Sequence, residues 1–281
     1  MDIAVVGGDR RWHALASLLI DGGEEVTAVG FETLGGPAYP PEAVKAALAR
    51  AACIVLPAPA FENDMVCAPC SAAPVPARWI AACAAEDAII FAGRPGVALE
   101  GTRAKVVDYL QWEPYAVANG ELTAEGALEI LMRERDRALS GARVLVTGYG
   151  RIGKLLCRKL RALGARLTVA ARKPGDLAMI AAMGDTPVPI QGLPGLELPF
   201  DIVVNTVPAP VIGKELLRHL PEDGVCLELA SRPGGFDPAA ETMGIRLIRA
   251  PGLPGKYAPV TAGEILRDTI YYFMEEMRKR P

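Results

Sequence analysis

The 281-residue sequence contains very little histidine, which limits the chemistry it can perform. Only His13 and His219 occur, and neither lies where an expected strand ends at a cleft. An ordinary dehydrogenase of 2-hydroxy acids needs a histidine as acid and base beside the carbinol. The sequence therefore disfavours that class of enzyme.

Long apolar runs and blocks of basic residues are also missing. The apolar stretch at residues 51–61 is far shorter than the roughly 20 residues that cross a bilayer, and prolines interrupt it. The 30 Lys and Arg residues are matched by 33 Asp and Glu residues and form no long basic block. We therefore expect neither a membrane protein nor a nucleic-acid-binding protein.

The cysteines and the start of the chain indicate a cytoplasmic protein. Six cysteines occur without the spacing of a disulfide framework, and the chain opens on a strand-like segment instead of a secretory signal. Cys67 and Cys70 form a lone Cys-x-x-Cys pair in an expected loop. Because a zinc site needs four ligands, we predict no metal.

The sequence does contain a regular alternation of apolar strand-like and amphipathic helix-like segments. Apolar residues make up 51% of the chain, and its length suits two domains. Buried parallel strands appear as continuous apolar runs between helices, so the alternation predicts an α/β fold. We expect two Rossmann-like, doubly wound parallel-sheet domains joined by a long helix, with a C-terminal helix that packs back on the first domain.

The same pattern gives the expected boundaries. We expect a substrate-binding and catalytic α/β domain at 1–122, an interdomain helix at 123–139, a dinucleotide-binding domain at 140–255 and a returning C-terminal segment at 256–281. The bridging helix has a plausible start near Thr123 and Gly126, and a stop at Ser140 and Gly141. Two segments are expected to be irregular: the loop at 62–76, and the region around prolines 187, 189, 194 and 199.

The strongest local signal is a glycine-rich turn between an expected strand at 143–147 and an expected helix at 152–163. Gly148 permits the tight turn, Gly150 lets backbone amides approach a pyrophosphate, and Gly153 lets the helix pack closely on the sheet. The helix start adds free N–H groups and a positive dipole end. A flavodoxin-like fold whose glycines only tighten a turn is the alternative. The predicted dinucleotide-binding residues of this turn are Gly148, Tyr149, Gly150, Arg151, Ile152 and Gly153.

The end of the next strand discriminates between cofactors. About twenty residues past the glycines, an NAD site usually has an acidic residue that binds the ribose hydroxyls. Here the expected strand at 166–171 is followed by Arg172 and Lys173. Two charge-assisted bonds of roughly 1.5–3 kcal/mol each would favour NADP over NAD by about a hundredfold or more. NAD remains possible, and a solvated basic turn is the alternative.

Two later strand ends of the same domain complete the expected cofactor site. Ligands of open parallel sheets lie beyond the carboxyl ends of the strands, so these loops should flank the adenosine-ribose and nicotinamide ends of the cofactor. Arg232, in the second loop, could hold a substrate carboxylate in a bidentate pair, or could be a surface arginine made rigid by Pro233. The further predicted cofactor contacts are Thr206, Val207, Pro208, Ala230 and Ser231.

The first domain opens on a similar strand-to-helix turn. Gly7 and Gly8 form an anion-binding turn that lacks the third glycine, so we assign no second dinucleotide. A small anionic substrate near Asp9, Arg10 or Arg11 is one interpretation, and a plain turn with solvated charges is the other. We include Gly8 and Arg10 among the predicted substrate-binding residues. Arg94 lies in another strand-end loop and is a further candidate for binding a carboxylate.

Several segments together resemble one known family. They are Ile-Ala-Val-Val-Gly-Gly-Asp at 3–9, Leu-Ala-Ser-Arg-Pro-Gly-Gly at 229–235 and Ala-Pro-Gly-Leu-Pro-Gly at 250–255, followed by Ala-Pro at 258–259 and Thr-Ala-Gly at 261–263. In this order they are similar to the A subunit of dipicolinate synthase, over nearly the whole chain. The Ser-Arg-Pro-Gly-Gly and Pro-Gly-Leu-Pro-Gly pieces are much more specific than the glycine fingerprint.

The resemblance implies a function in endospore-forming bacteria. The A subunit of this family works with a flavoprotein-like B subunit, on a branch of the lysine pathway. The pair converts a dihydrodipicolinate intermediate to dipicolinate in the cytoplasm of the mother cell during sporulation. A nicotinamide cofactor, with NADP preferred to NAD, is implied for the A subunit. A homo-oligomer is compatible with the sequence.

The implied reaction suits the residues that are present. The precursor ring carries two carboxylates and becomes aromatic by losing a hydride and a proton, so the protein has mainly to orient it and supply modest base catalysis. The cationic candidates for the two carboxylates are Arg232, Arg94, Arg10 and Lys256. The candidates for the base are Asp9, Glu125 and Lys256. Glu125 lies near the expected start of the bridging helix, where it could instead only interact with the helix dipole.

Two other functions remain open at this point. The chain could be a two-domain dehydrogenase of another oxo or hydroxy acid. It could also be a non-catalytic scaffold that binds a dinucleotide and activates the B subunit, because no complete acid–base set is visible in the sequence.

Overall fold

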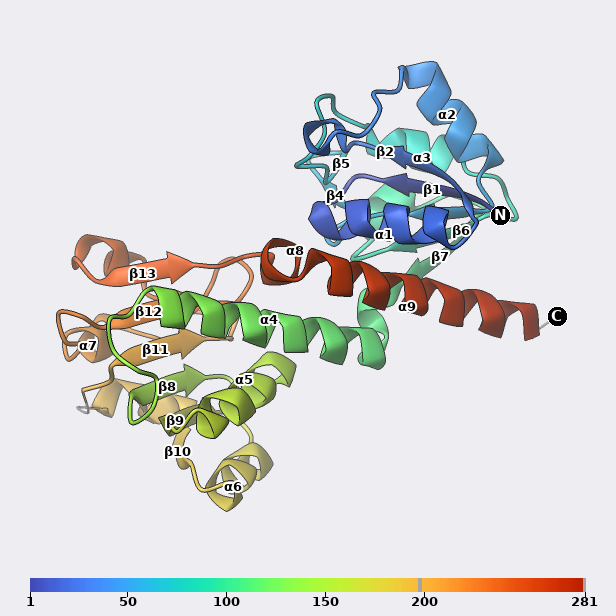
Figure 1. Cartoon of the computed structure of the whole chain (residues 1–281). Coiled ribbons are helices and arrows are strands. Elements are labelled where there is room, and N and C mark those ends of the chain that lie inside the picture. Colours follow the sequence, from blue (N-terminus) through green and yellow to red (C-terminus); the bar gives the residue numbers. More distant parts are fainter. Residues whose placement is uncertain (197–198, 280–281) are drawn as a thin grey trace. The chain divides into compact units, whose positions relative to one another are not determined.

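The computed structural model describes residues 1–196 and 199–279 (Figure 1). The chain divides into two compact units. The first unit combines Met1–Asn119 with the C-terminal segment that begins at Pro254, and the second unit is Gly120–Leu253. Each unit is built on one parallel sheet, which confirms the predicted α/β fold. No helix in the described residues is long and apolar enough to cross a membrane.

The first unit has a five-stranded parallel sheet in the order β2-β1-β3-β6-β7. Its central strands are buried on both faces, which explains their continuous apolar sequence. The strands are β1 (Asp2–Val6), β2 (Glu25–Val29), β3 (Cys53–Val55), β6 (Ile89–Ala92) and β7 (Lys105–Asp108). The helices are α1 (Arg10–Asp21), α2 (Pro41–Arg50), α3 (Ala77–Cys83), α8 (Leu253–Tyr257) and α9 (Pro259–Lys279).

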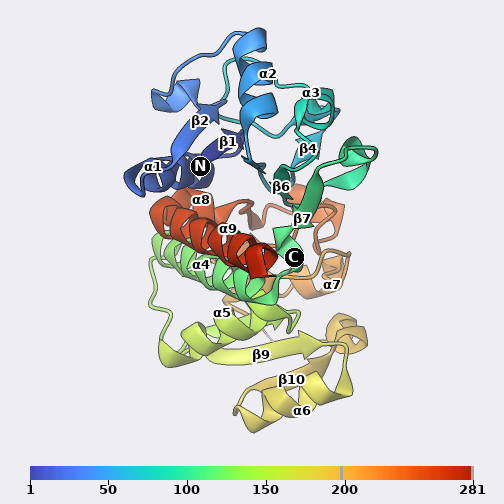
Figure 2. The same cartoon turned by 90° about the vertical axis from the view of Figure 1, so that its right-hand side faces the viewer.

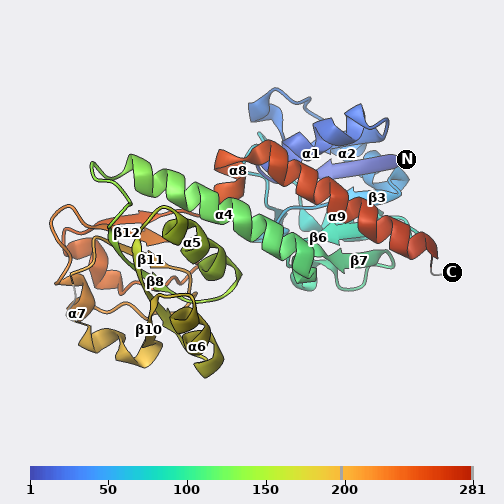
Figure 3. The ribbon, with the colours of Figure 1, turned by 60° about the horizontal axis from the view of Figure 1, so that its bottom comes forward.

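Helices cover both faces of this sheet. On one face, side chains of α2 and α3 such as Leu48 and Ile80 pack on the strands. On the other face, α9 runs alongside α1, and its Leu266 and Ile270 are buried with Leu15 (Figures 2 and 3). The C-terminal helix therefore packs back on the first unit, as predicted.

The second unit has a six-stranded parallel sheet in the order β10-β9-β8-β11-β12-β13. This is the strand order of doubly wound dinucleotide-binding folds. The chain adds strands outward from β8 toward one edge of the sheet and then, from β11 on, toward the other edge. The strands are β8 (Arg143–Thr147), β9 (Arg166–Ala171), β10 (Thr186–Pro189), β11 (Ile202–Asn205), β12 (Val225–Glu228) and β13 (Arg246–Arg249). The helices are α5 (Arg151–Ala162), α6 (Pro174–Ala182) and α7 (Lys214–Leu217).

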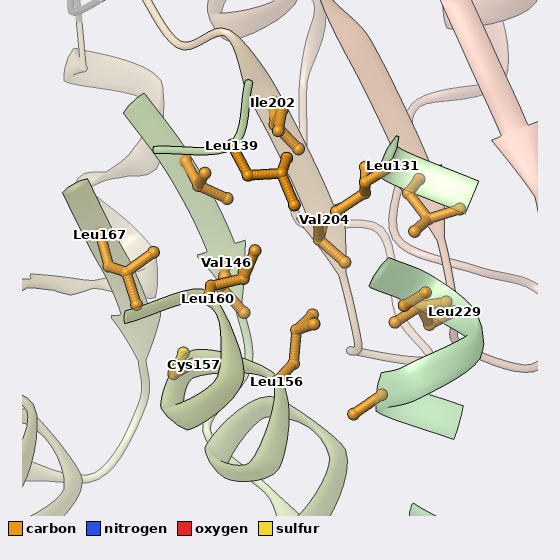
Figure 4. Close-up of a cluster of buried hydrophobic side chains, with 14 of the residues drawn as sticks. Leu131, Leu139, Val146, Leu156, Cys157, Leu160, Leu167, Ile202, Val204 and Leu229 are labelled. Atoms are coloured by element: carbon orange, nitrogen blue, oxygen red, sulfur yellow. The ribbon is translucent and has the colours of Figure 1, made fainter. Parts of the chain in front are cut away.

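Alternation along β8 divides the core of the second unit between the two faces of the sheet. Val146 packs with Leu156 and Leu160 of α5 on one face (Figure 4). Leu145 points to the other face, where it is buried with Leu216 of α7. Both faces are thus apolar, and polar side chains are left for the ends of the strands.

The long helix is displaced from its predicted position at 123–139. Helix α4 spans Glu113–Arg133, beginning in the first unit and ending in the second. Pro114 stands in its first turn, where proline favours helix initiation. The residues after Arg133 form a turn, with Leu139 buried in the core. The second unit accordingly includes much of α4 and starts at residue 120 rather than 140.

Two segments that were expected to be irregular contain short strands. Within 62–76, β4 (Phe61–Glu62) and β5 (Met65–Val66) form a hairpin. Asn63 and Asp64 both have positive φ, as a two-residue hairpin turn requires. In the proline-rich segment, β10 is an edge strand beside β9, and proline is tolerated on an edge because no neighbour needs its missing N–H.

We expect Ile270→Ala to destabilise the first unit by about 2–5 kcal/mol, because the side chain is 1% exposed and its removal leaves a cavity between α9 and the sheet. Asp268→Ala is the matched control, because Asp268 is exposed on the same helix. Urea unfolding followed by hydrogen exchange in each unit measures the effect. Equal stability of the two variants would contradict the packing described for α9.

Candidate functional site

The glycine-rich turn of the second unit has the close contacts that its motif requires. Gly148 has φ +95°, and a Cβ placed there would lie 2.3 Å from Oγ1 of Thr206. A Cβ on Gly153 would lie 2.2 Å from the carbonyl oxygen of Gly148. A Cβ on Gly150 would meet nothing within 4 Å. Two glycines therefore close the turn onto the sheet, and the third leaves open space before α5.

The start of α5 is suited to an anion. Gly150 is the N-cap and offers no side-chain oxygen to the first N–H groups of the helix. The first turn contains no acidic residue, and Arg151 is exposed there. Ile152 and Tyr149 are partly buried against the core. The positive dipole end of α5 thus lies beside the open space at Gly150.

The basic pair lies where the sequence predicts it, directly after β9. Arg172 and Lys173 are both exposed, and neither side chain forms a hydrogen bond or ion pair within the described residues. The N–H of Gly148 donates to the carbonyl of Ala170 at 2.8 Å, which joins the end of β9 to the glycine turn. The pair is therefore available to a ligand anion beside the turn.

A buried polar network connects the other two loops of this edge, and the sequence analysis did not identify it. Thr147, Asn205 and Glu228 are the last residues of three adjacent strands and pair side by side in register. The hydroxyl of Thr147 donates to Oδ1 of Asn205 at 2.6 Å, and Nδ2 of Asn205 donates to Oε1 of Glu228 at 2.6 Å. Polar residues ending successive apolar strands are the signal that could have revealed it.

The network holds both loops by their backbones. Asn205 donates to the carbonyl of Val207 at 2.8 Å and accepts from the N–H of Val207 at 3.1 Å. Glu228 accepts from the N–H groups of Ala230, at 2.9 Å, and Gly235, at 2.6 Å. Hydrogen bonds from these buried side chains therefore hold the backbones of the loops that begin at Thr206 and Ala230. Their exposed residues include Pro208, Ser231 and Arg232.

The corresponding edge of the first unit contains an ordered ion pair. Asp9 caps α1 by accepting from the N–H of Arg11 at 3.0 Å, and its carboxylate also accepts from Nε and Nη2 of Arg11, each at 2.9 Å. The guanidinium carbon lies 4.5 Å from the centre of the Trp12 ring. Burial lowers the pKa of the Arg11 guanidinium, but its bonds to Asp9 outweigh this and raise it overall.

Glycines allow this cluster to form. Gly8 has φ +96°, and a Cβ there would lie 2.5 Å from the Trp12 ring. A Cβ on Gly255 of α8 would lie 2.6 Å from Oδ2 of Asp9. The Gly-Gly-Asp motif and the Pro-Gly-Leu-Pro-Gly motif, far apart in the sequence, thus meet at the Asp9 carboxylate.

A cavity of about 580 Å³ opens beside the ion pair. Asp9, Arg11 and Trp12 line one side, and the loops after β3 and around the β4–β5 hairpin line the rest. Cys67 is on its wall, and burial raises the pKa of that thiol, so it is a poor nucleophile at neutral pH. Within residues 1–196 and 199–279, no three His, Cys, Asp or Glu residues are grouped to hold a metal.

The remaining predicted substrate residues are placed differently. Arg10 is exposed and lines a separate cavity of about 370 Å³ with His13. Arg94 is exposed with φ +53°, after β6. Lys256 is exposed on α8. Arg232 belongs to the second unit.

Glu125 does not lie at a helix start, contrary to the expectation from sequence. It lies within α4 because that helix begins at Glu113. Its Oε1 accepts from Nζ of Lys159 on α5 at 3.0 Å. The geometry therefore gives Glu125 a contact between two helices of the second unit.

We expect Gly153→Ala to destabilise the second unit by about 1–3 kcal/mol or more, because the new methyl group would overlap the Gly148 carbonyl. Gly175→Ala is the control. It lies in the first turn of α6 with nothing within 4 Å, and replacing that glycine should leave stability unchanged or raise it by about 0.4–1 kcal/mol. Thermal and urea unfolding compare the variants, and a harmless Gly153→Ala would disprove the close contact.

Comparison with known proteins identifies relatives over the whole chain. Residues 2–103 match the family model for the N-terminal domain of the A subunit of dipicolinate synthase. The A subunit of dipicolinate synthase from Bacillus subtilis (strain 168) is 35% identical over 195 residues, which are 68% of this chain and 66%, just under two thirds, of that protein.

Solved structures extend the likeness. The crystal structure of the A subunit of dipicolinate synthase from Bacillus halodurans is 30% identical, with a TM-score of 0.84 over 96% of both chains. The corresponding crystal structure from Bacillus subtilis is also 30% identical, with a TM-score of 0.83 over 99% of this chain and 97% of that one. A transhydrogenase and two dehydrogenases, at 17% identity or less, share only the fold. These findings confirm the resemblance read from the sequence: the chain belongs to the family of dipicolinate synthase A subunits.

Proposed function

We propose that the chain is the redox subunit of a dipicolinate synthase. It binds NADP and, together with a flavoprotein-like B subunit, oxidises dihydrodipicolinate to dipicolinate in the cytoplasm of the sporulating mother cell. The observation that carries the proposal is the glycine turn of a dehydrogenase-like fold, followed by an exposed basic pair, in a member of this family. Family membership supports the substrate and the partner protein.

The residues present fit a dinucleotide. A cradle is formed where Gly148 and Gly153 close the turn and Gly150 leaves space at the start of α5. We propose that the pyrophosphate lies against the backbone N–H groups at the start of α5 and that Arg172 and Lys173 bind the 2′-phosphate. The loops fixed by Asn205 and Glu228 would then contact the ribose and nicotinamide ends through Thr206, Val207, Pro208, Ala230 and Ser231.

The protein's contribution to the reaction is to bind and orient. When bound, NADP supplies a hydride acceptor, and the substrate ring also loses one proton, so that dihydrodipicolinate becomes the aromatic dipicolinate and NADP becomes NADPH. Gain of aromaticity drives the reaction, so holding the two ring carboxylates in place accounts for most of the catalysis. Arg232, Arg94, Arg10 and Lys256 remain cationic candidates, and Asp9, Glu125 and Lys256 remain candidates for the base.

The acidic candidates differ in their surroundings. Asp9 lines the cavity of the first unit, and its oxygens accept bonds from Arg11. Glu125 accepts from Lys159 between α4 and α5. Of the two, Asp9 is the one that a ring in the cavity could contact, and we propose that it takes the proton or orients the group that does.

Replacing Arg172 with aspartate should reverse the preference between cofactors. Loss of one charge-assisted bond and repulsion by the new carboxylate should weaken NADP binding by about a hundredfold, and NAD binding should improve relative to NADP. Calorimetry with both coenzymes measures the change. Arg166→Asp is the control, because Arg166 is exposed at the opposite end of the same strand. An unchanged dissociation constant for NADP in Arg172→Asp would contradict the proposed contact of Arg172 with the 2′-phosphate.

The reaction itself is tested by nicotinamide absorbance. The pure chain is incubated with NADP and dihydrodipicolinate, either alone or mixed with the B subunit, and in parallel with 2-hydroxy acids. Formation of NADPH only from dihydrodipicolinate is expected. Turnover of a hydroxy acid without any turnover of dihydrodipicolinate would instead favour a dehydrogenase that acts on an oxo or hydroxy acid.

A Gly150→Ala variant addresses the scaffold alternative. The new methyl group meets no atom of the described residues within 4 Å, so the variant should fold normally while the methyl group fills the space proposed for the pyrophosphate. We expect NADP binding and the activity of the assembled synthase to fall at least tenfold together. Retention of full activity after loss of NADP binding would show that the nucleotide has no redox role.

A further inference from the structure

We propose that Arg11 is the residue of the first unit that binds a carboxylate of the substrate. This inference rests on the proposed function, since it names the contact by which a ring dicarboxylate is held. The sequence alone did not separate Arg11 from its neighbour Arg10. The structure gives the two side chains opposite surroundings.

The Arg11 guanidinium is held rigidly before any ligand arrives. Asp9 accepts from its Nε and Nη2, and the Trp12 ring lies 4.5 Å from its central carbon. Trp12 is itself fixed, because its indole N–H donates to the carbonyl of Leu56 at 3.2 Å and a Cβ on Gly8 would overlap its ring. An arginine fixed in this way loses little entropy when it binds a second anion.

Donors remain on this buried guanidinium. Arg11 is only 8% exposed, and it lines the 580 Å³ cavity. Asp9 occupies Nε and Nη2, and Nη1 makes no hydrogen bond to any described residue. A cation of this kind is paired on one side and has a free pair of N–H groups on the other. A carboxylate from the cavity can therefore bind it without displacing Asp9.

The rest of the cavity suits a small planar acid. Its wall includes Pro57, Pro59, Met65 and Val66, which offer apolar surface to a ring. Residues at the start of α1, including Gly8, Asp9 and Arg11, line the cavity, so the positive end of the helix dipole lies near it. The acidic group other than Asp9 on the wall is Glu62, which is exposed to solvent.

Arg10 lacks these features. It is exposed, has no fixed partner in the described residues, and lines the other cavity with His13 and Pro259. A flexible, solvated arginine contributes little to selective binding. The predicted contact of Arg10 with substrate is therefore reassigned, in this proposal, to Arg11.

The test measures binding of the two pyridine acids by calorimetry. Full-length protein with saturating NADP is titrated with pyridine-2,6-dicarboxylate and with pyridine-2-carboxylate. The wild type should prefer the dicarboxylate, because its two carboxylates contact two cations. In Arg11→Gln the dicarboxylate should bind at least tenfold more weakly, and the preference over the monocarboxylate should largely disappear. A merely structural effect would weaken both acids alike and leave their ratio unchanged.

Matched variants identify the arginine. Arg78→Gln, at an exposed position on α3, is the control and should keep the wild-type affinities and ratio. Arg10→Gln separates the two neighbouring arginines, and it should keep the preference that Arg11→Gln loses. If Arg10→Gln removes the preference and Arg11→Gln does not, the proposal is overturned. Arg11→Lys keeps the charge without the fork and should retain only part of the preference.

Two further outcomes separate this inference from the proposed function. If the wild type binds the dicarboxylate and Arg11→Gln binds it with the same affinity, the role of Arg11 is overturned and the proposed function stays intact. Failure of the wild type to bind either acid with NADP present overturns both. If the Arg11 variants do not fold, a crystal structure of the wild type with pyridine-2,6-dicarboxylate decides. A carboxylate within hydrogen-bond distance of Arg11 supports the proposal, and one bound elsewhere overturns it.

Discussion

The alignment of parallel strands is the constraint on which the candidate site depends. Within the five-stranded sheet of the first unit, and within the six-stranded sheet of the second, all strands are parallel. Apolar side chains cover both faces of each of these sheets. Charged side chains of these strands therefore lie at the strand ends, and the carboxyl ends share one edge. The glycine turn after β8, the basic pair after β9 and the Gly-Asp turn after β1 all lie at such edges.

Close backbone contact then determines the shape of these strand ends. Gly153 allows α5 to approach the Gly148 carbonyl closely, which places the start of the helix beside the open space at Gly150. In the first unit, Gly8 and Gly255 perform a comparable task by making room for Trp12 and Asp9. The glycines do not contact a ligand through side chains. They set the distances at which charged and aromatic groups meet.

Buried polar groups supply the rigidity of the loops. Asn205 and Glu228 are 0% and 4% exposed, and their hydrogen bonds end on the backbones of the two loops beyond β11 and β12. Because an unpaired buried carboxylate is costly, the network favours one loop conformation. The Asp9–Arg11 pair has the same effect in the first unit. The order of the loops at both edges thus depends on hydrogen bonds from buried or half-buried side chains.

The sequence by itself determined the fold class, the glycine turn with its basic pair, and the family, because these depend on local periodicity and on short contiguous motifs. It misplaced α4: the start signal at Pro114 was available but Thr123 and Gly126 were preferred, and the end of the helix before the buried Leu139 depends on the core that forms around that residue. It also left the Asn205–Glu228 network unrecognised, and it could not show that Arg11 is buried beside Asp9 while Arg10 is exposed. Which face of α1 an arginine occupies, and which strands lie side by side, are decided only when the chain packs.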